Sequence, residues 1–516
     1  MNHYNIHAKT YERNEVYMIE MLKMGLVIIC TPTMILMLTV ATATGVLFGA
    51  LPGVSAAMGV TLMLPFSYSM GNAEGVAFLV AVYCAAITGG GITAILFRIP
   101  GTPASAPTVF DGYPMAQKGQ TGKALATSLI SSAIGGIFSA IVMFFLSKQL
   151  SDIALHFGTA ELFAVALLGL SILTSLDSEK PLKTFMSGIM GLIIATIGID
   201  SVTGVKRLTF GVTSLLSGIP MISVMIGMFA LTEVIVRIVS PIEMQSSSND
   251  GNVSNTFLSV KEALTLKWIW LRQSVMGTLI GILPGAGASI AAFLGYVAEV
   301  KLSKEPEKFG TGCLEGIAAP ETANNAATGG AMIPLLSLGI PGGNTAAIIA
   351  SAMTMKGMQL GPLLMSKQPD LLSVTFLSMI FVNIVMVFIA IGIAKIFSKI
   401  INLPYCGLGS FIIMLCMTGS FAIQNNVANM TIMVIAGAIG IIFIQMGFSP
   451  SAFILGLVLG PICETNLRRA VLIAHGNYAK VFTRPLTLII VSVCVIVNII
   501  PLVWPKIKAM QLKKNS

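Results

Sequence analysis

The sequence predicts an all-α membrane protein with about twelve transmembrane helices in two repeats, which we expect to be inverted. Three observations lead to this prediction: the composition, the length of the apolar runs, and a pair of glycine–proline motifs that occurs twice. Of the 516 residues, 55% are hydrophobic and only 10% are charged, and the mean hydropathy is +0.88. Soluble proteins carry about 25% charged residues, so the bilayer is the expected solvent for this chain.

Apolar runs that can cross a bilayer occur along the whole chain. A transmembrane helix needs roughly 20 apolar residues, and four runs reach this length without interruption: 25–49, 124–146, 373–394 and 486–503. Other runs follow one another closely and are interrupted by Gly, Pro or Asn. Because each span must satisfy its own backbone hydrogen bonds in lipid, we expect helices, and the alternation typical of a membrane barrel does not occur.

Polar stretches divide the chain. The net charge of +9 comes largely from basic residues in short loops and at the C-terminus. This distribution is typical of positive-inside topology rather than nucleic-acid binding, and it predicts a cytoplasmic C-terminus. The predicted division is a polar N-terminal segment (1–24), a first membrane repeat (25–240), a polar connecting loop (241–268), a second membrane repeat with C-terminal helices (269–505) and a basic tail (506–516).

The two repeats are indicated by a motif that occurs once in each half. Residues 45–53 read GVLFGALPG and residues 277–285 read GTLIGILPG, so both match GxxxGxLPG without a gap. Small residues alone would indicate close packing of membrane helices. The LPG ending favours a helix that breaks within the membrane, because Pro removes a backbone donor and Gly permits positive φ.

A second pair of motifs follows the first in each half. Residues 89–103 read GGGITAILFRIPGTP and residues 329–345 read GGAMIPLLSLGIPGGNT. They agree in two glycines, a short apolar run and IPG, with one residue inserted in the second copy. Four breaks predict a central site, because new helix N-termini offer N–H groups to a carboxylate and helix C-termini offer carbonyls to a cation.

Polar side chains next to the breaks are the candidate ligands. The hydroxyls of Thr102, Ser105 and Thr108 follow the first IPG, and the segment EGIAAPETANNAATGG precedes the second. Polar groups at membrane depth either link helices or bind a ligand, and Asn324 and Asn325 could instead cap a helix. The predicted substrate-binding residues are Pro52, Gly53, Ser55, Arg98, Gly101, Thr102, Gly285, Gly287, Ser289, Gly342 and Asn344, and the predicted coupling-ion residues are Asn324, Asn325, Thr345 and Glu321.

Several charged residues have two interpretations. Arg98 either extends to the membrane surface or grips a substrate carboxylate in a two-pronged way. Glu321 either carries the coupling ion or lies in a surface loop. Asp111, in FDGYP, is predicted to occupy a turn, and Glu233 is predicted to pair with Arg237 at helical spacing.

Motifs of other functional classes are missing from the sequence. LPGAGAS lacks the Lys-Ser/Thr of a phosphate-binding loop, and neither GxSxG nor HExxH occurs. The seven cysteines and four histidines are dispersed, without a CxxC pair. An enzyme, a metal centre and an ATP-driven pump are therefore not expected, and no cofactor is expected beyond a coupling cation, Na⁺ or H⁺.

Taken together, these motifs resemble the large membrane subunit (TctA type) of the tripartite tricarboxylate transporters. The matching stretches run in family order from about Met18 to about Pro485, and the segment from Pro306 to Gly343 is the most specific. The stretches are GVLFGALPG, GGITAILFRIPGTPASAPTVFDGYPMAQKG, IGMFALTEV, GILPGAGASIAAFLGYVAE, PEKFGTGCLEGIAAPETANNAATGGAMIPLLSLGIPGG and LGPICETNLRRAVLIAHGN.

The resemblance implies a permease of the bacterial inner membrane that imports an organic acid by symport with Na⁺ or H⁺. It also implies a small four-helix membrane subunit (TctB type), a periplasmic binding protein (TctC type) and an architecture similar to that of elevator-type carriers. The sequence departs from the family pattern at Thr88 and Gly91, where Tyr and Ser are usual, at Arg98, where Asn is usual, and at LGP (360–362), where a PGP-like stretch is usual. The changes at the first break leave the identity of the acid open.

The predicted function is therefore uptake of a di- or tricarboxylate by cation symport. Two alternatives remain. A passive anion channel would need no coupling ion, and a filter motif of charged or carbonyl rings is missing from the sequence. A membrane scaffold subunit without its own transport site would not require repeated breaks at membrane depth.

Overall fold

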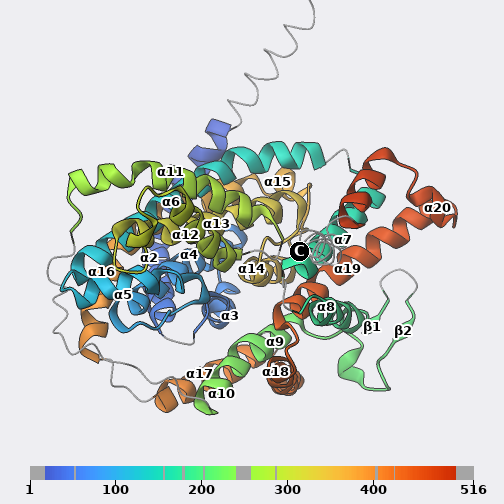
Figure 1. Cartoon of the computed structure of the whole chain (residues 1–516). Coiled ribbons are helices and arrows are strands. Elements are labelled where there is room, and N and C mark those ends of the chain that lie inside the picture. The colour runs from blue at the N-terminus through green and yellow to red at the C-terminus, as the bar shows by residue number, and fades with distance from the viewer. Residues whose placement is uncertain are drawn as a thin grey trace, which may run out of the picture.

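The computed structural model is built almost wholly of helices (Figure 1), which confirms the predicted all-α class. Within the described part of the chain, the strands form one short antiparallel ribbon, in which β1 (Gly198–Ile199) pairs with β2 (Lys206–Arg207). The structure describes residues 18–51, 54–154, 157–176, 180–200, 204–239, 257–284, 287–400, 405–422 and 425–495.

The first half of the chain begins with residues 18–29 in a helical conformation. The next helix starts at Pro32, where the Thr31 hydroxyl accepts a hydrogen bond from the backbone N–H of Met34 and so caps the helix. The elements that follow are α2 (Pro32–Ala50), α3 (Ala56–Ser67), α4 (Asn72–Phe97), η1 (Pro103–Ser105), α5 (Thr108–Gln117), α6 (Thr121–Ala154), α7 (Thr159–Leu176), α8 (Pro181–Ala195), η2 (Thr213–Leu215), α9 (Met221–Met225), the π-helical turn η3 (Ile226–Leu231) and α10 (Thr232–Val239).

The second half begins at a capping box, in which Ser259 and Glu262 exchange hydrogen bonds at the start of α11. Lys123 of α6 also donates to Glu262, and this hydrogen bond, together with those from Ser259, lowers the pKa of the Glu262 carboxyl to about 2. The elements are α11 (Val260–Ile282), α12 (Gly287–Leu302), η5 (Pro306–Lys308), α13 (Leu314–Leu338), α14 (Asn344–Met355), α15 (Leu364–Lys367), α16 (Pro369–Ile400), α17 (Tyr405–Ala422), α18 (Val427–Met446), α19 (Pro450–Ile473) and α20 (Tyr478–Val481).

Helix boundaries differ in two places from the predicted division of the chain. Residues 18–24, assigned to the polar N-terminal segment, are helical, and α11 begins at Val260, inside the range assigned to the connecting loop (241–268). Most of that loop and the basic tail (506–516) lie outside the described residues. The capping box explains the early start of α11, because it satisfies backbone donors at the helix end without apolar residues.

Seven helices in the described part of the chain are long and apolar enough to cross a membrane, and five shorter apolar helices have 10–17 residues. The chain is therefore a multi-pass membrane protein. The number of about twelve spans stays a prediction, because several of these helices are too short to cross alone.

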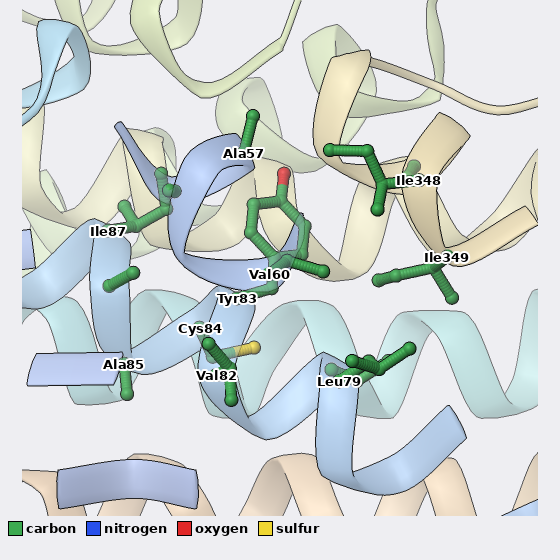
Figure 2. Packing of buried hydrophobic residues seen from close by; sticks show 14 of the residues in the cluster. Ala57, Val60, Leu79, Val82, Tyr83, Cys84, Ala85, Ile87, Ile348 and Ile349 are labelled. Carbon is green, nitrogen blue, oxygen red and sulfur yellow. The ribbon is translucent and has the colours of Figure 1, made fainter. Parts of the chain in front are cut away.

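Helices of the two halves pack together in the core. Figure 2 shows Val60 of α3, Tyr83 of α4 and Ile348 and Ile349 of α14 in one cluster of buried side chains. The helix after the LPG segment of the first half therefore contacts the helix after the IPG segment of the second half. In the same way, α12 contacts η1, which follows the IPG segment of the first half.

The packing of α2 on α4 corresponds to the packing of α11 on α13. Gly49 of α2 lies so close to the carbonyl oxygen of Ala86 in α4 that a Cβ on this glycine would collide with it. Gly281 of α11 has the same relation to the carbonyl oxygen of Ala327 in α13. The glycines of the two GxxxGxLPG motifs therefore let each pair of helices approach closely, while the inverted repeat as a whole stays a prediction.

The breaks after α4 and α13 also correspond. The backbone N–H of Gly101 donates to the carbonyl of Gly90 at 3.2 Å, and that of Gly342 donates to Ala331 at 3.3 Å. Each hydrogen bond joins residues eleven apart, so the two IPG breaks align without the inserted residue that the sequence comparison suggested. The chain folds back on its own helix at both breaks, which satisfies backbone groups freed by the break.

Gly101→Ala is expected to destabilise the folded protein by about 1–3 kcal/mol, because its Cβ would be forced into the carbonyl oxygen of Gly49 and the turn at Gly90. Thermal unfolding in detergent measures the effect. Gly392→Ala is the matched control: Gly392 lies in α16 with no atom within 4 Å of an added Cβ. It should raise the melting temperature, and equal melting temperatures for the two variants would contradict the packing described for the break.

Beside the helices described so far, Figure 1 shows two further groups of segments. One combines α7 and α8 with α19, and the other combines α9, η3 and α10 with α17 and α18. Each group therefore joins segments from both halves of the chain. Close contacts of glycine with backbone hold them together, as at Gly191 beside Phe453 and at Gly227 beside Met433.

Candidate functional site

A fully buried carboxyl group lies at the centre of the first site. Glu321 of α13 accepts hydrogen bonds from the hydroxyls of Thr108, at 2.6 Å, and Ser132, at 3.1 Å, and a longer one from the Asn324 amide, at 3.4 Å. All three donors are neutral. Among the residues that the structure describes, the ion pairs do not include Glu321.

Three helices and one turn bring these groups together. Thr108 is the first residue of α5, Ser132 lies in the middle of α6, and the carbonyl of Ala104 in η1 accepts from the Asn324 amide at 3.1 Å. The elements after the first IPG break thus fold over the face of α13 that carries Glu321. Gly135 permits the close approach of α6, because it faces the backbone carbonyl of Thr322 directly.

A chain of amides continues from this site toward α4. The Asn325 amide donates to the Asn324 carbonyl oxygen at 2.8 Å, and the Thr88 hydroxyl donates to the Asn325 carbonyl oxygen at 2.9 Å. All of these side chains are fully buried. The asparagines therefore link α13 to α4 and to η1, and the alternative capping role is wrong for both, because they lie well inside α13.

The arrangement suits a small cation. An ionised carboxylate in a membrane interior is costly unless a positive charge accompanies it. Around Glu321 the available ligands are carboxyl, hydroxyl, amide and backbone oxygens, which are the ligands of hard cations, and a proton can bind the carboxyl itself. The surface-loop alternative for Glu321 is wrong, because the side chain is inside α13 with no exposed area.

The predicted substrate residues after the first break lie near this cluster. Thr102 and Ser105 are buried with their hydroxyl oxygens 3.2 Å apart, and both lie against Gly90 of α4. Gly101 forms the fold-back described above. Ala104 lies between Thr102 and Ser105, and its carbonyl accepts from the Asn324 amide, so this segment adjoins the Glu321 cluster.

The predicted residues after the second break occupy another place. The Asn344 amide donates to the hydroxyl of Ser451 in α19 at 2.6 Å, and Thr345 is buried in α14. Gly342 packs on Gly281 and Ala331. Thr345 is one of the predicted coupling-ion residues, but it is not among the hydrogen-bond partners of Glu321.

The LPG segments are described in part. Pro52, Gly53 and Gly285 lie outside the described residues. Ser55 caps α3 by accepting from the backbone N–H of Met58 at 3.1 Å. Gly287 begins α12 in the left-handed region (φ 62°), and Ser289 is partly buried in the same helix.

Arg98 ends α4 in the left-handed conformation (φ 59°), and Gly339 ends α13 in the same way (φ 76°). The Arg98 side chain is exposed, and its guanidinium carbon lies 5.9 Å from the centre of the Tyr113 ring. It is not among the hydrogen-bond partners of Glu321. Arg98 therefore lies at an exposed end of the first break.

Arg98→Gly separates the structural role of this position from a role in binding. A left-handed residue other than Gly costs about 1–2 kcal/mol, so the variant should be more stable by about 1 kcal/mol in thermal unfolding. If Arg98 also contacts the substrate anion, the KM for uptake rises while stability rises. Gly339→Ala, at the corresponding position, is expected to be less stable, and a stable Gly339→Ala would contradict the strain argument.

Asp111 was predicted to occupy a turn, and this prediction is wrong. It lies in α5 with no exposed area, and its carboxylate accepts from the backbone N–H groups of Gly310, Gly312 and Cys313 at 2.9–3.0 Å. The hydroxyl of Tyr296 in α12 donates to it at 2.9 Å. Asp111 therefore fixes the segment that leads into α13. It lies one helical turn after Thr108, the residue of α5 that contacts Glu321.

A corresponding contact follows the second break. The Lys356 ammonium, just after α14, donates to the carbonyls of Met70 at 2.8 Å and Gly71 at 3.4 Å, which precede α4. Asp111 after the first break thus holds the start of α13, and Lys356 after the second break holds the start of α4. Elsewhere, the predicted pair of Glu233 and Arg237 is confirmed at 3.1 Å.

The sequence reasoning missed part of the Glu321 cluster. Thr108 was expected only as a donor near the first break, and Ser132 was not singled out. A pattern that could have found Ser132 is the row of serines at helical spacing in TSLISSAIGGIFSA, because hydroxyls on one face of a membrane helix either link helices or bind a ligand.

Comparison with known protein families identifies one family. The model of the tripartite tricarboxylate transporter TctA family matches residues 35–455. The chain is similar to an uncharacterized 52.8 kDa protein of Agrobacterium vitis, in the TAR-I ttuC' 3' region, with 34% identity over 95% of this chain and 98% of that protein. It is also similar to an uncharacterized protein of the TAR-II ttuC' 3' region of that organism, with 36% identity over 45% of this chain and 96% of that protein. No solved structure shows a significant match.

Proposed function

Because the chain belongs to the TctA family of tripartite tricarboxylate transporters, we propose that it imports a small organic acid, a di- or tricarboxylate, by symport with a cation. As a member of that family the chain is a component of a transporter. Its apolar helices make it a multi-pass membrane protein. The bacterial inner membrane is the proposed location. The proposed partners are a small membrane subunit of the TctB type and a periplasmic binding protein of the TctC type.

One observation supports the coupling to a cation. Glu321 is buried among neutral hydrogen-bond donors, so in its ionised form it is a negative charge without a protein counter-charge in the described residues. A cation that binds there and leaves on the other side of the membrane would offset this charge in each transport cycle. In this proposal, Asn324 and Asn325 support the cation site, and Na⁺ and H⁺ are both candidate cations.

The proposed acid site lies where the breaks of the two halves approach each other. The N-terminal ends of α3 and α14 follow the first LPG and the second IPG, and these two helices pack together. Helix N-termini carry partial positive charge and unpaired N–H groups, which suit carboxylates. Ser55 and Asn344 are the polar side chains at these two ends.

Uptake by proteoliposomes tests the proposal. The full chain, reconstituted with its partner subunits, is given labelled succinate, malate and citrate, with and without an inward Na⁺ or H⁺ gradient. We expect one acid to accumulate above equilibrium and to leak back when the gradient is dissipated. Equilibration of the acid at a rate that depends on neither gradient would indicate a passive channel. The absence of any transport would favour the scaffold alternative.

A further inference from the structure

A loop with many exposed apolar side chains connects α8 to α9. We call it the hairpin: it comprises residues 198–200 and 204–219, and β1 and β2 pair within it. Figure 1 shows the hairpin at the edge of the helical body, beside α8. Its exposed large apolar residues are Ile199, Val205, Leu208, Phe210 and Val212. A contiguous group of this kind marks a surface that contacts another protein or a membrane.

Two of these side chains are presented by an unfavourable backbone. Leu208 has φ 49° and Phe210 has φ 48°, both in the left-handed region that residues with a Cβ rarely adopt. Thr209 between them is buried, whereas Phe210 is 80% exposed, more than any other large apolar residue in the described ranges. Strained backbone of this kind occurs mostly at sites of binding and function. The hairpin therefore presents Leu208 and Phe210 to a surface outside the chain.

Charged side chains fix the hairpin to α19. The guanidinium of Arg207, in β2, donates to both carboxylate oxygens of Glu464. Arg468 donates to the carboxylate of Asp200, which follows β1, at 2.6 Å. Both strands are thus held on α19, so the exposed side chains cannot fold back onto the protein unless these ion pairs break.

The hairpin lies beside the far part of a membrane helix. α8 runs alongside α19 in the same direction, because Lys183 donates to the carbonyl of Met446 at 2.6 Å and Gly191 packs on Phe453 further along. With 15 residues α8 is too short to cross a bilayer. α19 continues beyond the end of α8, and the hairpin packs on this continuation.

The length of α19 places the hairpin near a membrane boundary. α18 and α19 are both long enough to cross the membrane and follow each other closely, so Pro450, the first residue of α19, lies near one boundary. At 1.5 Å per residue, Glu464 and Arg468 lie about 21 and 27 Å along the helix. Because the hydrocarbon core is about 30 Å thick, these ion pairs lie close to the opposite boundary, where charges and loop backbone can reach water.

An apolar stripe on α8 leads toward the hairpin. Its members recur every three or four residues, which places them on one side of the helix. They are exposed and comprise Leu182, Phe185, Met186, Ile189 and Ile193. In a multi-pass membrane protein an exposed apolar stripe faces lipid, and Ile199 of the hairpin continues this surface beyond the end of α8.

The charge of the hairpin suits a phospholipid surface. The acidic residue of its described part, Asp200, is buried and paired with Arg207 and Arg468. Lys206 is exposed next to Val205, so the exposed charge here is positive. A lysine beside large apolar side chains is typical of segments in the membrane interface, where the cation meets lipid phosphates and the apolar groups enter the acyl region.

We propose that the hairpin is a membrane-interface anchor. The side chains of Val205, Leu208 and Phe210 enter the acyl region of the phospholipids at the bilayer boundary, and Lys206 contacts their phosphates. Burial of apolar surface in lipid offsets the cost of the left-handed backbone. Because the hairpin is tied to α19 by the ion pairs of Arg207 and Asp200, the anchor also holds α19 at a fixed depth in the bilayer.

Photo-crosslinking of the full chain in phospholipid vesicles tests this anchor. Benzoylphenylalanine, which reacts with nearby C–H groups on illumination, replaces Phe210 or one of two controls. Phe388 is exposed in the middle of α16 and is the lipid-facing control, while Lys308 lies among charged residues before α13 and is the water-facing control. We expect phospholipid adducts at positions 210 and 388 in similar yield, with several-fold less at 308. A yield at 210 as low as that at 308 would overturn the anchor.

The same experiment with the proposed partner subunits distinguishes lipid from protein. Vesicles are prepared with and without the small membrane subunit, and mass spectrometry identifies what is joined to position 210. We expect the yield of phospholipid adduct to be the same in both preparations. Replacement of the lipid adduct by an adduct with the subunit would show that the hairpin is a protein docking surface, and the anchor would be wrong.

Quenching of tryptophan fluorescence by brominated phospholipids measures the depth of the hairpin. Phe210→Trp and Phe388→Trp are compared, each as the difference from the wild-type chain with its three tryptophans. Phe210→Trp should be quenched several-fold more by bromines near the headgroup than by bromines near the chain ends, and Phe388→Trp should show the reverse order. Quenching of Phe210→Trp by aqueous iodide alone, or most strongly by the deep bromines, would contradict a place at the boundary.

Discussion

Glu321→Gln is expected to abolish accumulation of the acid above equilibrium while the protein still folds and still exchanges external for internal acid. Gln has the shape of Glu; its amide oxygen can accept from the hydroxyl of Thr108 or Ser132 and its NH₂ group can donate to the other, so most of the local packing survives. It carries no charge and cannot take up a proton. Exchange requires the carrier to reorient only with its load, whereas net uptake requires the cation to bind and leave in each cycle. Gradient-driven uptake and exchange in the same vesicles measure the two steps.

The control for this variant lies on the same helix. Glu315→Gln makes the same chemical change in the first turn of α13, where the side chain is partly exposed. A carboxylate there interacts favourably with the helix N-terminus by only about 0.3–1 kcal/mol, so uptake should stay close to wild type. A Glu315→Gln protein as uncoupled as Glu321→Gln would show that loss of any negative charge on α13 is sufficient, and Glu321 would lose its assigned role.

Asp111→Ala is expected to destabilise the protein by more than about 3 kcal/mol, a larger loss than for the glycine substitutions at the breaks. The Asp111 carboxylate accepts hydrogen bonds from three backbone N–H groups and from the hydroxyl of Tyr296. Hydrogen bonds to a charged group contribute about 1.5–3 kcal/mol each, and the donors left behind are partly buried. The variant should give little folded protein in fluorescence-detected size-exclusion chromatography. Asp111→Asn, which keeps one acceptor oxygen, should recover part of it.

Asp152→Ala provides the comparison for Asp111→Ala. Asp152 lies on the surface of α6, where Lys148 donates to it one turn away at 3.3 Å. Exposed pairs of this kind contribute about 0–1 kcal/mol, so the yield of folded protein should hardly change. If Asp111→Ala were as well folded as Asp152→Ala, the carboxylate would not be what fixes the segment before α13.

The broken helices could be predicted from the sequence because their cause is local. Pro removes a donor and Gly tolerates a left-handed backbone wherever they occur, so the IPG motifs indicate breaks without knowledge of the fold. The structure confirms fold-backs at Gly101 and Gly342. The correct alignment of the two IPG motifs came only from the structure. The hydrogen bonds that define it place Gly90 opposite Ala331, and these two residues differ in the sequence.

The partners of Glu321 and Asp111 could not be predicted because they come from distant parts of the chain. Thr108 and Ser132 are about 200 residues from Glu321, and the segment that Asp111 holds is equally far from it. Asp-Gly is a good local indication of a turn, but the backbone N–H groups before α13 stabilise Asp111 inside a helix. Long-range contacts of this kind depend on which helices pack, and hydropathy does not determine that.

Glu321 is the proposed carrier of the coupling cation, and the most direct test of this role counts cations against acid. Vesicles that hold the complete transporter are given labelled acid, and the entry of the acid and of H⁺ or Na⁺ is recorded at the same time. We predict a fixed ratio of cation to acid in the wild type, and acid exchange without any cation entry in Glu321→Gln. The same cation-to-acid ratio in both proteins would contradict this role of Glu321.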